Sequence, residues 1–297
     1  MGEIEEIQKK YSIVGRRTEL EKALSVVKAG RHLLIEGPVG VGKTVIALAI
    51  SNHIEKSTYR VDGDERYTEQ KLTGWFDPPI VLKMGYVKEA FIPGHLTMAM
   101  QNGGVLFINE LNRMPESVQN VLLPSMDEFK IEIPKIGRIS AQDGFAIIAT
   151  QNPREFIATT SLSEALRDRF ELVLLDYQPE EEEIEIVQLR TGVDDLNLVK
   201  SVVLTTRASR NHSDIRRGAS IRAAISICQL ALQLGRDAEA IRKACHISLP
   251  TRIELKEDAK KSLTEIIDEI INSVFEKTVP VSYESNIGTK DDNQKKK

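Results

Sequence analysis

The chain has 297 residues, of which 41% are hydrophobic and 28% are charged. This composition is typical of a soluble protein, and the length predicts two domains or one domain with a helical appendage. With 40 basic and 44 acidic residues, the net charge of −4 disfavours a nucleic-acid-binding protein, although it does not exclude a local basic patch.

The sequence gives little indication of a disulfide, a metal site or a membrane segment. Cys228 and Cys245 lie in apolar helical patterns and are predicted to be small core residues rather than disulfide or zinc ligands. The five histidines include no pair at the spacing that places two metal ligands on one helix face. No apolar run approaches the roughly 18 residues that a membrane span needs, and the charged N-terminus is unlike a signal peptide. We therefore expect a cytoplasmic protein without a membrane segment.

Helical patterns alternate with short apolar runs from the N-terminus to residue 178. Residues 1–30 predict two helices joined by a turn at residues 14–17, with the second helix begun by Thr18. Strands that alternate with helices form parallel sheets, which bind ligands at the carboxyl ends of their strands. The pattern predicts an α/β domain with a parallel five-stranded sheet, whose strands are Leu33–Glu36, Tyr59–Val61, Val105–Asn109, Phe145–Thr150 and Leu172–Leu175.

A phosphate-binding loop follows the first predicted strand. The sequence after Glu36 matches G-x-x-x-x-G-K-[ST] and lies between a strand and a helix, which is the context this motif requires. Glycines allow backbone N–H groups to surround phosphate oxygens, the lysine reaches the β- and γ-phosphates, and the hydroxyl contacts Mg²⁺. We predict that a nucleoside triphosphate binds at Gly37, Pro38, Val39, Gly40, Val41, Gly42, Lys43 and Thr44.

The third predicted strand ends in Asn109 and Glu110, where nucleotide hydrolases need an acidic pair. The first acid of such a pair organises Mg²⁺, and the second polarises the attacking water. The amide of Asn109 can accept a hydrogen bond from a Mg²⁺-bound water, but it brings no negative charge. We predict that Asn109 lies at the metal and that Glu110 is the catalytic base. The alternative for Glu110 is a solvated carboxylate at a strand end.

Two further positions are candidates for a hydrolytic site. Asn152 follows the fourth strand, where an amide can hold the lytic water or the γ-phosphate, although Asn-Pro is also a common turn. Arg169 precedes the last strand and is placed to reach the γ-phosphate of a neighbouring subunit. The alternative for Arg169 is an ion pair with Asp168 or Glu164.

The pattern becomes helical after residue 178. The four glutamates at residues 180–183 complement the dipole of a first helical turn, and no strand is predicted before Phe275. Ser220 can cap a helix whose first turn holds Arg222, and because arginine suits that end of a helix poorly, we predict a phosphate contact for it. We expect an all-α lid domain at residues 179–276 and a disordered tail at residues 277–297. One face of the capped helix is predicted to contain Ile221, Ile225, Cys228 and Leu232.

Together these motifs resemble the AAA+ ATPases, and within them the MoxR family. The resemblance covers about residues 11–250 and rests on five motifs. They look like Walker A, Walker B with the Asn-Arg that follows it in MoxR proteins, sensor 1, the arginine-finger box and sensor 2. In this chain they are Gly37–Thr44, Phe107–Arg113, Ala149–Pro153, Leu162–Phe170 and Gly218–Ala223.

The resemblance implies ATP and Mg²⁺ as cofactors and a role for each matching residue. Lys43 and Thr44 would hold the phosphates and Mg²⁺, while Glu110 would be the base. The chain departs from the family at Asn109, where the family usually has Asp, which affects Mg²⁺ affinity and hydrolysis more than nucleotide binding. The remaining implied roles are sensor 1 for Asn152, a finger acting in trans for Arg169, sensor 2 for Arg222, and an adenine lining for Val14 and Gly15.

The family also implies a hexameric ring that uses ATP to remodel or mature client proteins, with a von Willebrand factor A domain protein as a frequent partner. Two β-hairpin insertions are typical of this branch, and the candidates here are Thr73–Phe91 and Lys130–Arg138. Trp75, the only tryptophan, lies in the first of them. It is either a contact for a partner or client or an anchor for the loop itself.

Two other functions stay open from the sequence. The first is a nucleotide-gated binding module with little turnover, because Asn109 weakens the metal site. The second is a nucleic-acid motor, since helicase cores share these motifs. The near-neutral charge and the lack of aromatic residues near a basic stripe disfavour the motor.

Overall fold

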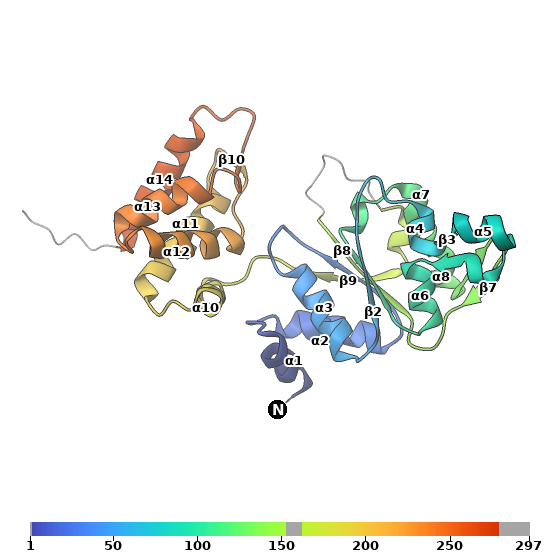
Figure 1. Ribbon diagram of the computed structural model, residues 1–297. Coiled ribbons are helices and arrows are strands. Elements are labelled where there is room, and N and C mark those ends of the chain that lie inside the picture. The colour runs from blue at the N-terminus through green and yellow to red at the C-terminus, as the bar shows by residue number, and fades with distance from the viewer. Residues whose placement is uncertain (1, 153–161, 279–297) are drawn as a thin grey trace, which may run out of the picture. The chain divides into compact units, whose positions relative to one another are not determined.

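The chain divides into two compact units, residues 1–182 and residues 183–297, in a computed structural model that describes residues 2–152 and 162–278. The first unit is a sheet with helices on both faces, and the second is mainly helical (Figure 1). Among the described residues, no helix combines the length and apolar character that crossing a bilayer requires. The predicted tail begins at residue 277, the last described helix ends at Thr278, and residues 279–297 lie outside the described part.

Five parallel strands form the sheet of the first unit in the spatial order β2-β5-β8-β1-β9, which confirms the predicted α/β fold. Each strand lies within two residues of its predicted bounds. Because β1 lies between β8 and β9, and β5 adjoins β8, the loops after these strands share one edge of the sheet. The bounds are β1 (His32–Glu36), β2 (Thr58–Asp62), β5 (Val105–Asn109), β8 (Ala146–Gln151) and β9 (Phe170–Leu174).

The sheet is buried on both faces because its central strands are apolar at almost every position. Successive side chains alternate between the faces, so Leu33 and Ile35 join one core cluster while Leu34 joins the other. The first cluster packs against α1 (Glu3–Tyr11), α2 (Arg17–Lys28) and α3 (Lys43–His53). The second packs against α6 (His95–Gln101), α7 (Glu116–Asn120) and α8 (Leu122–Asp127).

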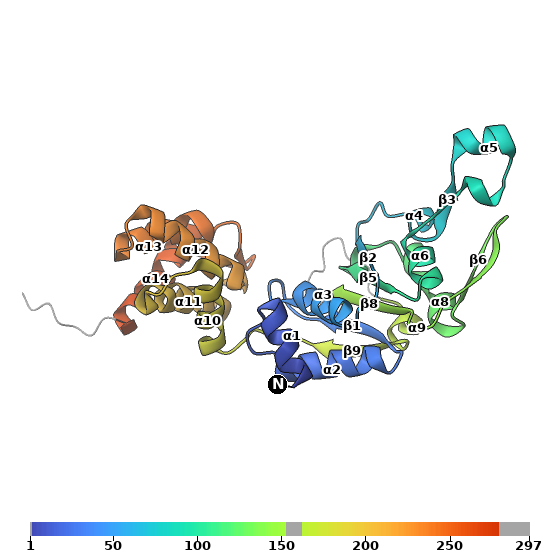
Figure 2. The same cartoon turned by 60° about the horizontal axis from the view of Figure 1, so that its bottom comes forward.

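Two excursions leave the sheet (Figure 2). The excursion that comes later in the chain is the predicted hairpin, formed by β6 (Lys130–Ile133) and β7 (Gly137–Ser140). The first is not a simple hairpin, because two prolines in the first turn of α5 begin a helix between its strands. Its elements are α4 (Glu69–Thr73), β3 (Gly74–Phe76), α5 (Pro78–Met84), η1 (Lys88–Ala90) and β4 (Phe91–Pro93). The remaining short helices of the unit are η2 (Leu111–Arg113) and α9 (Glu164–Arg167).

The second unit contains five helices and one small antiparallel sheet within its described residues. That sheet was not predicted, because its strands of three and two residues are too short to produce an alternating pattern. The helices are α10 (Glu180–Thr191), α11 (Leu196–Asn211), α12 (Ile221–Leu234), α13 (Ala238–Ser248) and α14 (Leu263–Thr278). The strands are β10 (Ile215–Arg217) and β11 (Glu254–Leu255).

The residues predicted to share one face of α12 pack against the core of the second unit, but, apart from Cys228, they are not its most buried residues. Cys228 is fully buried, as is Cys245 on α13, but Ile221, Ile225 and Leu232 are only partly buried. Because α12 packs against both α11 and α13, small side chains occupy its close contacts. The fully buried residues of α12 are Ala223, Ala224, Ile227, Cys228 and Ala231.

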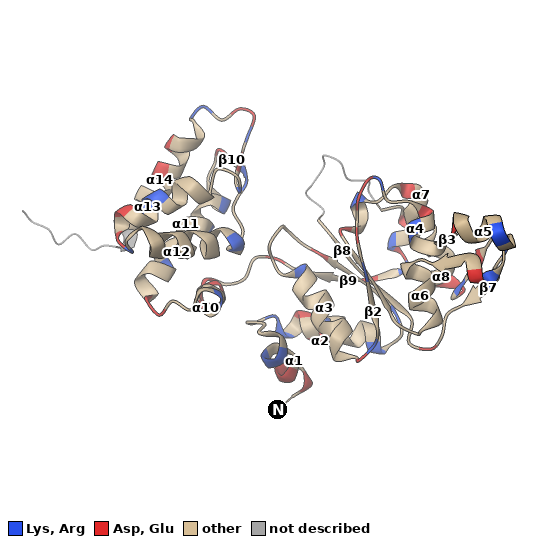
Figure 3. Ribbon diagram, viewed as in Figure 1, with Lys and Arg blue, Asp and Glu red and all other residues tan. Residues whose placement is uncertain are grey.

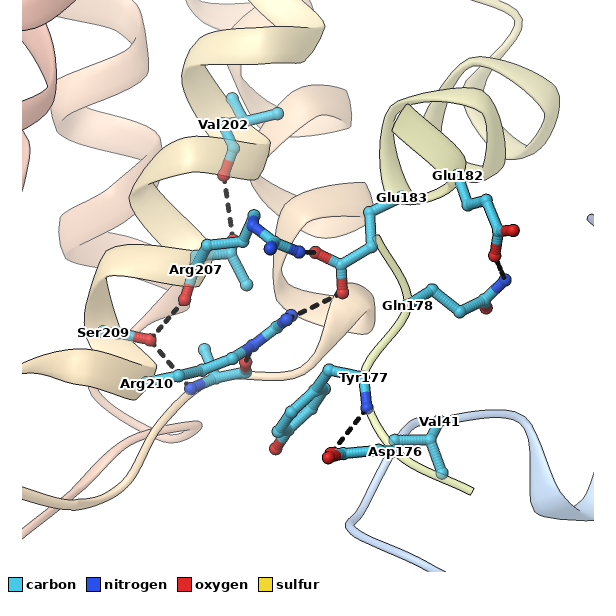
Figure 4. Close-up of polar contacts among 12 residues, drawn as sticks. Val41, Asp176, Tyr177, Gln178, Glu182, Glu183, Val202, Arg207, Ser209 and Arg210 are labelled. Carbon is cyan, nitrogen blue, oxygen red and sulfur yellow. Dashed lines mark hydrogen bonds and ion pairs between the residues drawn. The ribbon is translucent and has the colours of Figure 1, made fainter. Parts of the chain in front are cut away.

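A buried carboxylate joins α10 to α11 (Figure 4). Glu183 is only 2% exposed and accepts hydrogen bonds from Nη1 of Arg207 at 2.9 Å and Nη1 of Arg210 at 2.8 Å. Glu183 is therefore not a solvated first-turn carboxylate, because it is neutralised by two arginines. Arg210 Nε also donates to the carbonyl oxygen of Ala219 at 2.8 Å, which fixes the segment before α12.

Candidate nucleotide-binding site

The predicted phosphate-binding loop connects β1 to α3 at the carboxyl edge of the sheet. Gly40 and Gly42 have φ angles of 83° and 96°, a left-handed conformation that favours glycine. A Cβ at Gly37 would lie 2.3 Å from the carbonyl oxygen of Leu175, so a side chain does not fit there. Helix α3 begins at Lys43, and the N–H groups of its first turn have no partners within the helix. These groups and the loop form a site suited to phosphate.

Lys43 lies across this loop. Its Nζ donates hydrogen bonds to the carbonyl oxygens of Gly37 at 2.6 Å and Pro38 at 2.7 Å. The predicted role of the lysine requires its ammonium group to exchange these carbonyls for phosphate oxygens.

Arg16 connects the N-terminal helices to the same loop and was not predicted to do so. Its guanidinium donates to the carbonyl oxygens of Val41 at 3.2 Å and Asp176 at 2.5 Å, and it pairs with Glu19 at 2.9 Å. The side chain is buried, and its backbone is left-handed, with φ of 59°. The sequence offered little warning of this role, because an arginine before a helix is common on surfaces.

The predicted adenine-lining residues are held by two glutamines. Gln178 Nε2 donates to the carbonyl oxygen of Val14 at 2.9 Å, and Gln8 Nε2 donates to that of Gly15 at 2.5 Å. A Cβ at Gly15 would lie 2.2 Å from the Glu182 carboxylate, and its φ is 62°. The turn is therefore fixed in position by contacts from both ends of the first unit.

The two residues predicted at the metal contact each other directly. Thr44 Oγ1 donates to Asn109 Oδ1 at 3.0 Å, and Thr150 Oγ1 donates to the same oxygen at 3.0 Å. The Thr150 hydroxyl in turn accepts from the backbone N–H of Glu110 at 3.0 Å. Thr150 lies two residues before Asn152 at the end of β8, and this position was the only sequence signal for its role.

These oxygens fit a Mg²⁺ ion that is held mainly by phosphate. Mg²⁺ takes oxygen ligands, keeps several waters, and commonly uses one or two protein groups beside substrate phosphates. Thr44 offers a hydroxyl oxygen. Asn109 Oδ1 lies next to it and would contact the ion by exchanging one of the two threonine hydroxyls that it accepts from. Across the ranges 2–152 and 162–278, no three His, Cys, Asp or Glu side chains are grouped to hold a metal by themselves.

Glu110 adopts a left-handed conformation at the point where β5 ends, with φ of 57° and ψ of 52°. Its Oε2 accepts a hydrogen bond from Arg113 Nη1 at 2.9 Å, and both side chains are partly exposed. Arg113, within the Asn-Arg of the predicted Walker B segment, thus covers the carboxylate predicted to be the base. This contact engages Oε2 only, so Arg113 can position the carboxylate while Oε1 accepts a proton from water.

Asn152 is buried directly after β8. Its carbonyl oxygen accepts from Asn112 Nδ2 at 3.2 Å, which ties the end of β8 to η2. The preceding Gln151 donates its amide to the carboxylate of Glu36, which stands opposite it on β1. Asn152 therefore lies at the same sheet edge as Glu110 and the loop, while Pro153 of the same motif lies outside the described residues.

Arg169 is paired with a carboxylate that the sequence did not suggest. Its Nε and Nη2 contact the two carboxylate oxygens of Asp127 at 2.7 and 2.5 Å, and its partner is thus neither Asp168 nor Glu164. The pairing raises the pKa of Arg169 and lowers the pKa of Asp127. Arg167, on the exposed side of α9, makes no side-chain hydrogen bond or ion pair with the rest of the described chain.

Arg222 belongs to the second unit, so it is not among the residues that the first unit brings together. It is exposed in the first turn of α12. Ser220 occupies the N-cap position with an extended backbone, but its side chain makes no capping hydrogen bond, contrary to the prediction.

The sequence is similar to known proteins over most of its length. Residues 32–170 match the family described as AAA domain (dynein-related subfamily). The gas vesicle ATPase GvpN1 of Halobacterium salinarum is 26% identical over 274 residues, which cover 86% of this chain and 77% of that protein. The uncharacterized protein YojN of Bacillus subtilis is 28% identical over 215 residues, or 70% of each chain.

Solved structures share the fold at low identity. The RuvB Holliday junction branch migration motor of Thermotoga maritima superposes with a TM-score of 0.51 at 18% identity, over 79% of this chain and 70% of that one. NtrX of Brucella abortus, solved in complex with ADP, gives a TM-score of 0.54 at 17% identity, over 88% of this chain and 59% of that one. Residues 32–170 thus resemble the AAA domains of the dynein-related subfamily, and the chain as a whole is similar to ATPases of the GvpN kind.

Proposed function

We propose that the chain is a Mg²⁺-dependent ATP phosphohydrolase that assembles into a homo-oligomeric ring, hexameric by family resemblance, and remodels client proteins in the cytoplasm. The observation that carries the proposal is the run of hydrogen bonds through Thr44, Asn109, Thr150 and the backbone of Glu110. It links the phosphate-binding loop to the predicted base, as hydrolysis of a bound nucleotide requires.

The residues of the first unit have distinct tasks in this proposal. Val14 and Gly15 line the adenine, and the N–H groups of residues 37–44 hold the phosphates, with Lys43 on the β- and γ-phosphates. Bound at Thr44 and Asn109, Mg²⁺ would neutralise phosphate charge. Glu110 accepts a proton from the attacking water, which Asn152 holds in place.

The remaining arginines complete the proposed site. We propose that Arg169 acts on a neighbouring subunit's γ-phosphate after leaving Asp127, and that Arg222 contacts phosphate from the lid, predicted at residues 179–276. For either task the arginine must give up its present contacts and bind phosphate oxygens instead. A guanidinium group suits this, because its planar fork of N–H donors matches the geometry of phosphate.

Exposed apolar side chains support the client-remodelling part of the proposal. The excursion between β3 and β4 exposes 88% of Leu82 and 59% of Met84, and Trp75 is also exposed rather than buried as a loop anchor. Patches of this kind mark protein-binding surfaces. Lys and Arg are interspersed with Asp and Glu along the described ribbon of each unit (Figure 3), which favours a protein client over nucleic acid. A von Willebrand factor A domain partner rests on the family resemblance alone.

The test is ATP hydrolysis by the Glu110→Gln variant. Removal of the base should lower steady-state turnover by at least about 100-fold, because general-base catalysis contributes that much, while nucleotide affinity is kept. Glu116→Gln, the same change at an exposed position of α7, is the matched control and should hydrolyse ATP normally. Wild-type turnover in Glu110→Gln would overturn the proposed role of this carboxylate.

Asn109 favours a second function, a nucleotide-gated binding module that turns over little. The two functions differ in the steady-state hydrolysis of the wild-type chain and in its response to Asn109→Asp. A slow wild-type enzyme that the substitution accelerates would support the binding module, with the neutral amide as its cause.

A further inference from the structure

Asp62 stands beside Asn109 at the carboxyl edge of the sheet. The two residues end neighbouring parallel strands and are direct partners in the register of β2 and β5. Asp62 Oδ1 accepts a hydrogen bond from Asn109 Nδ2 at 3.0 Å. The backbone fixes this arrangement, because Gly63 N–H donates to the Asn109 carbonyl oxygen at 2.7 Å and a Cβ on Gly63 would lie 2.1 Å from the Glu110 carbonyl oxygen.

The carboxylate of Asp62 determines which way the Asn109 amide faces. An amide can present either its oxygen or its nitrogen to a hydroxyl, because a hydroxyl both donates and accepts. An ionised carboxylate only accepts, so Nδ2 must face Asp62 and Oδ1 must face Thr44. Thr44 then donates its hydrogen to Oδ1, which leaves the oxygen lone pairs of its hydroxyl available to a cation. A reversed amide would turn that hydrogen toward the cation instead.

Asp62 is itself held in an ion pair, although its side chain is 59% exposed. Arg60 holds the carboxylate from the solvent side, with Nη2 to Oδ1 at 2.8 Å and Nε to Oδ2 at 3.2 Å. Arg60 itself lies over the ring of Phe107, 5.8 Å from its centroid. The carboxylate is therefore held in one place, one amide away from the Thr44 hydroxyl.

Building on the proposed ATPase function, we infer that Asp62 is a positioning residue that lets Asn109 serve a Mg²⁺–nucleotide complex. It orients the amide, and the ion pair with Arg60 holds the carboxylate that does so. Groups that orient metal ligands in this way typically change metal affinity by roughly 10- to 100-fold when they are removed.

The experiment measures binding of a fluorescent, non-hydrolysable ATP analogue to the full chain, in EDTA and across a MgCl₂ titration. Asp62→Asn should raise the Mg²⁺ concentration that gives half-maximal tight binding by roughly 10- to 100-fold. Affinity in EDTA should stay at the wild-type value, which a general loss of structure would not allow. Asp64→Asn is the control, since Asp64 is exposed two residues away and accepts a hydrogen bond from the Arg66 N–H.

A second background separates positioning from a structural effect. In Asn109→Asp, the metal-side residue has two equivalent oxygens and cannot be reversed, and it faces the Asp62 carboxylate as a like charge. Adding Asp62→Asn to this background should therefore not raise the Mg²⁺ requirement. The inference would be overturned if Asp62→Asn raised the Mg²⁺ requirement equally in both backgrounds. It would also be overturned if Asp62→Asn and Asp64→Asn had the same Mg²⁺ requirement. A wild-type chain that binds no nucleotide under either condition would instead overturn the proposed function on which it rests.

Discussion

Glu110 shows how single residues are constrained where the strand ends meet the loop. A left-handed backbone at a residue other than glycine costs on the order of 1 kcal/mol, so neighbouring contacts must impose it. Two contacts do so. The Thr150 hydroxyl accepts a hydrogen bond from the Glu110 N–H, and Gly63 packs directly against the Glu110 carbonyl oxygen. The strain directs the Glu110 side chain away from the β5 strand direction and toward Arg113. Strained backbone of this kind is common at functional sites.

His32 makes the stability of the first unit depend on pH. The ring is 4% exposed, and its Nδ1 accepts from the Ile147 N–H at 3.0 Å, which requires an unprotonated nitrogen. Burial is the main reason that the pKa of His32 falls from 6.5 to about 4, with the nearby cation of Arg31 acting in the same direction. The unfolded chain therefore binds the proton more readily, so stability is complete above pH 6.5 and falls as the pH decreases toward 4.

We expect this single group to account for about 2 kcal/mol of unfolding free energy lost between pH 7.5 and pH 5. The measurement is urea unfolding followed by the fluorescence of Trp75, the only tryptophan, which lies in the first unit. His32→Asn retains an acceptor near the Nδ1 position but does not titrate, so its stability should decrease by about 2 kcal/mol less over this range. Parallel pH profiles for the two proteins would contradict the assignment.

At the scale of elements, local patterns predicted what depends on local sequence. The five strands, the loop and its helix follow from apolar runs and glycine positions, so their bounds were close to those observed. The helix α5 and the pair β10–β11 were missed, because they are short and depend on contacts with distant segments. Pairings such as Glu183 with Arg207, or Asp62 with Asn109, join residues 24 and 47 positions apart and leave no periodic signal.

The excursion carrying α5 is the element that we expect to contact clients. Replacing Leu82 with Asn and Met84 with Gln should weaken binding of a fluorescently labelled, permanently unfolded polypeptide such as casein by roughly tenfold or more, because burial of these side chains is lost. The measurement uses Glu110→Gln with ATP, so that the nucleotide state is uniform. ATP hydrolysis of the double variant in the wild-type background should be unchanged, since no site residue is altered.

Ile247→Asn provides the control for this element, because Ile247 is an exposed apolar residue on α13 of the second unit. It should bind the polypeptide as tightly as the parent protein. If both variants lose binding equally, the effect comes from general surface polarity and α5 is not the contact.

At the scale of the whole molecule, the proposed role of Arg169 implies that one chain alone does not form a complete site. In the first unit Arg169 is engaged with Asp127, and the site residues Thr44, Asn109 and Glu110 are joined to each other without it. A head-to-tail ring would bring Arg169 of one subunit to the nucleotide of the next. Arg169→Ala should then lose turnover by about 10³-fold or more while keeping nucleotide affinity, as the removal of an arginine finger does.

Mixing two inactive variants tests this arrangement directly. Arg169→Ala subunits keep their own Glu110, and Glu110→Gln subunits keep their own Arg169, so a junction that pairs them in the right order is complete. An equimolar mixture should recover about one quarter of wild-type turnover, because two independent choices of one half give that fraction of complete junctions. Arg167→Ala is the comparison, since Arg167 is an exposed arginine two residues before Arg169 and its loss should leave turnover near wild type. A mixture without recovery, together with an inactive Arg167→Ala, would assign the trans-acting role to Arg167 and leave Arg169 as the partner that holds Asp127.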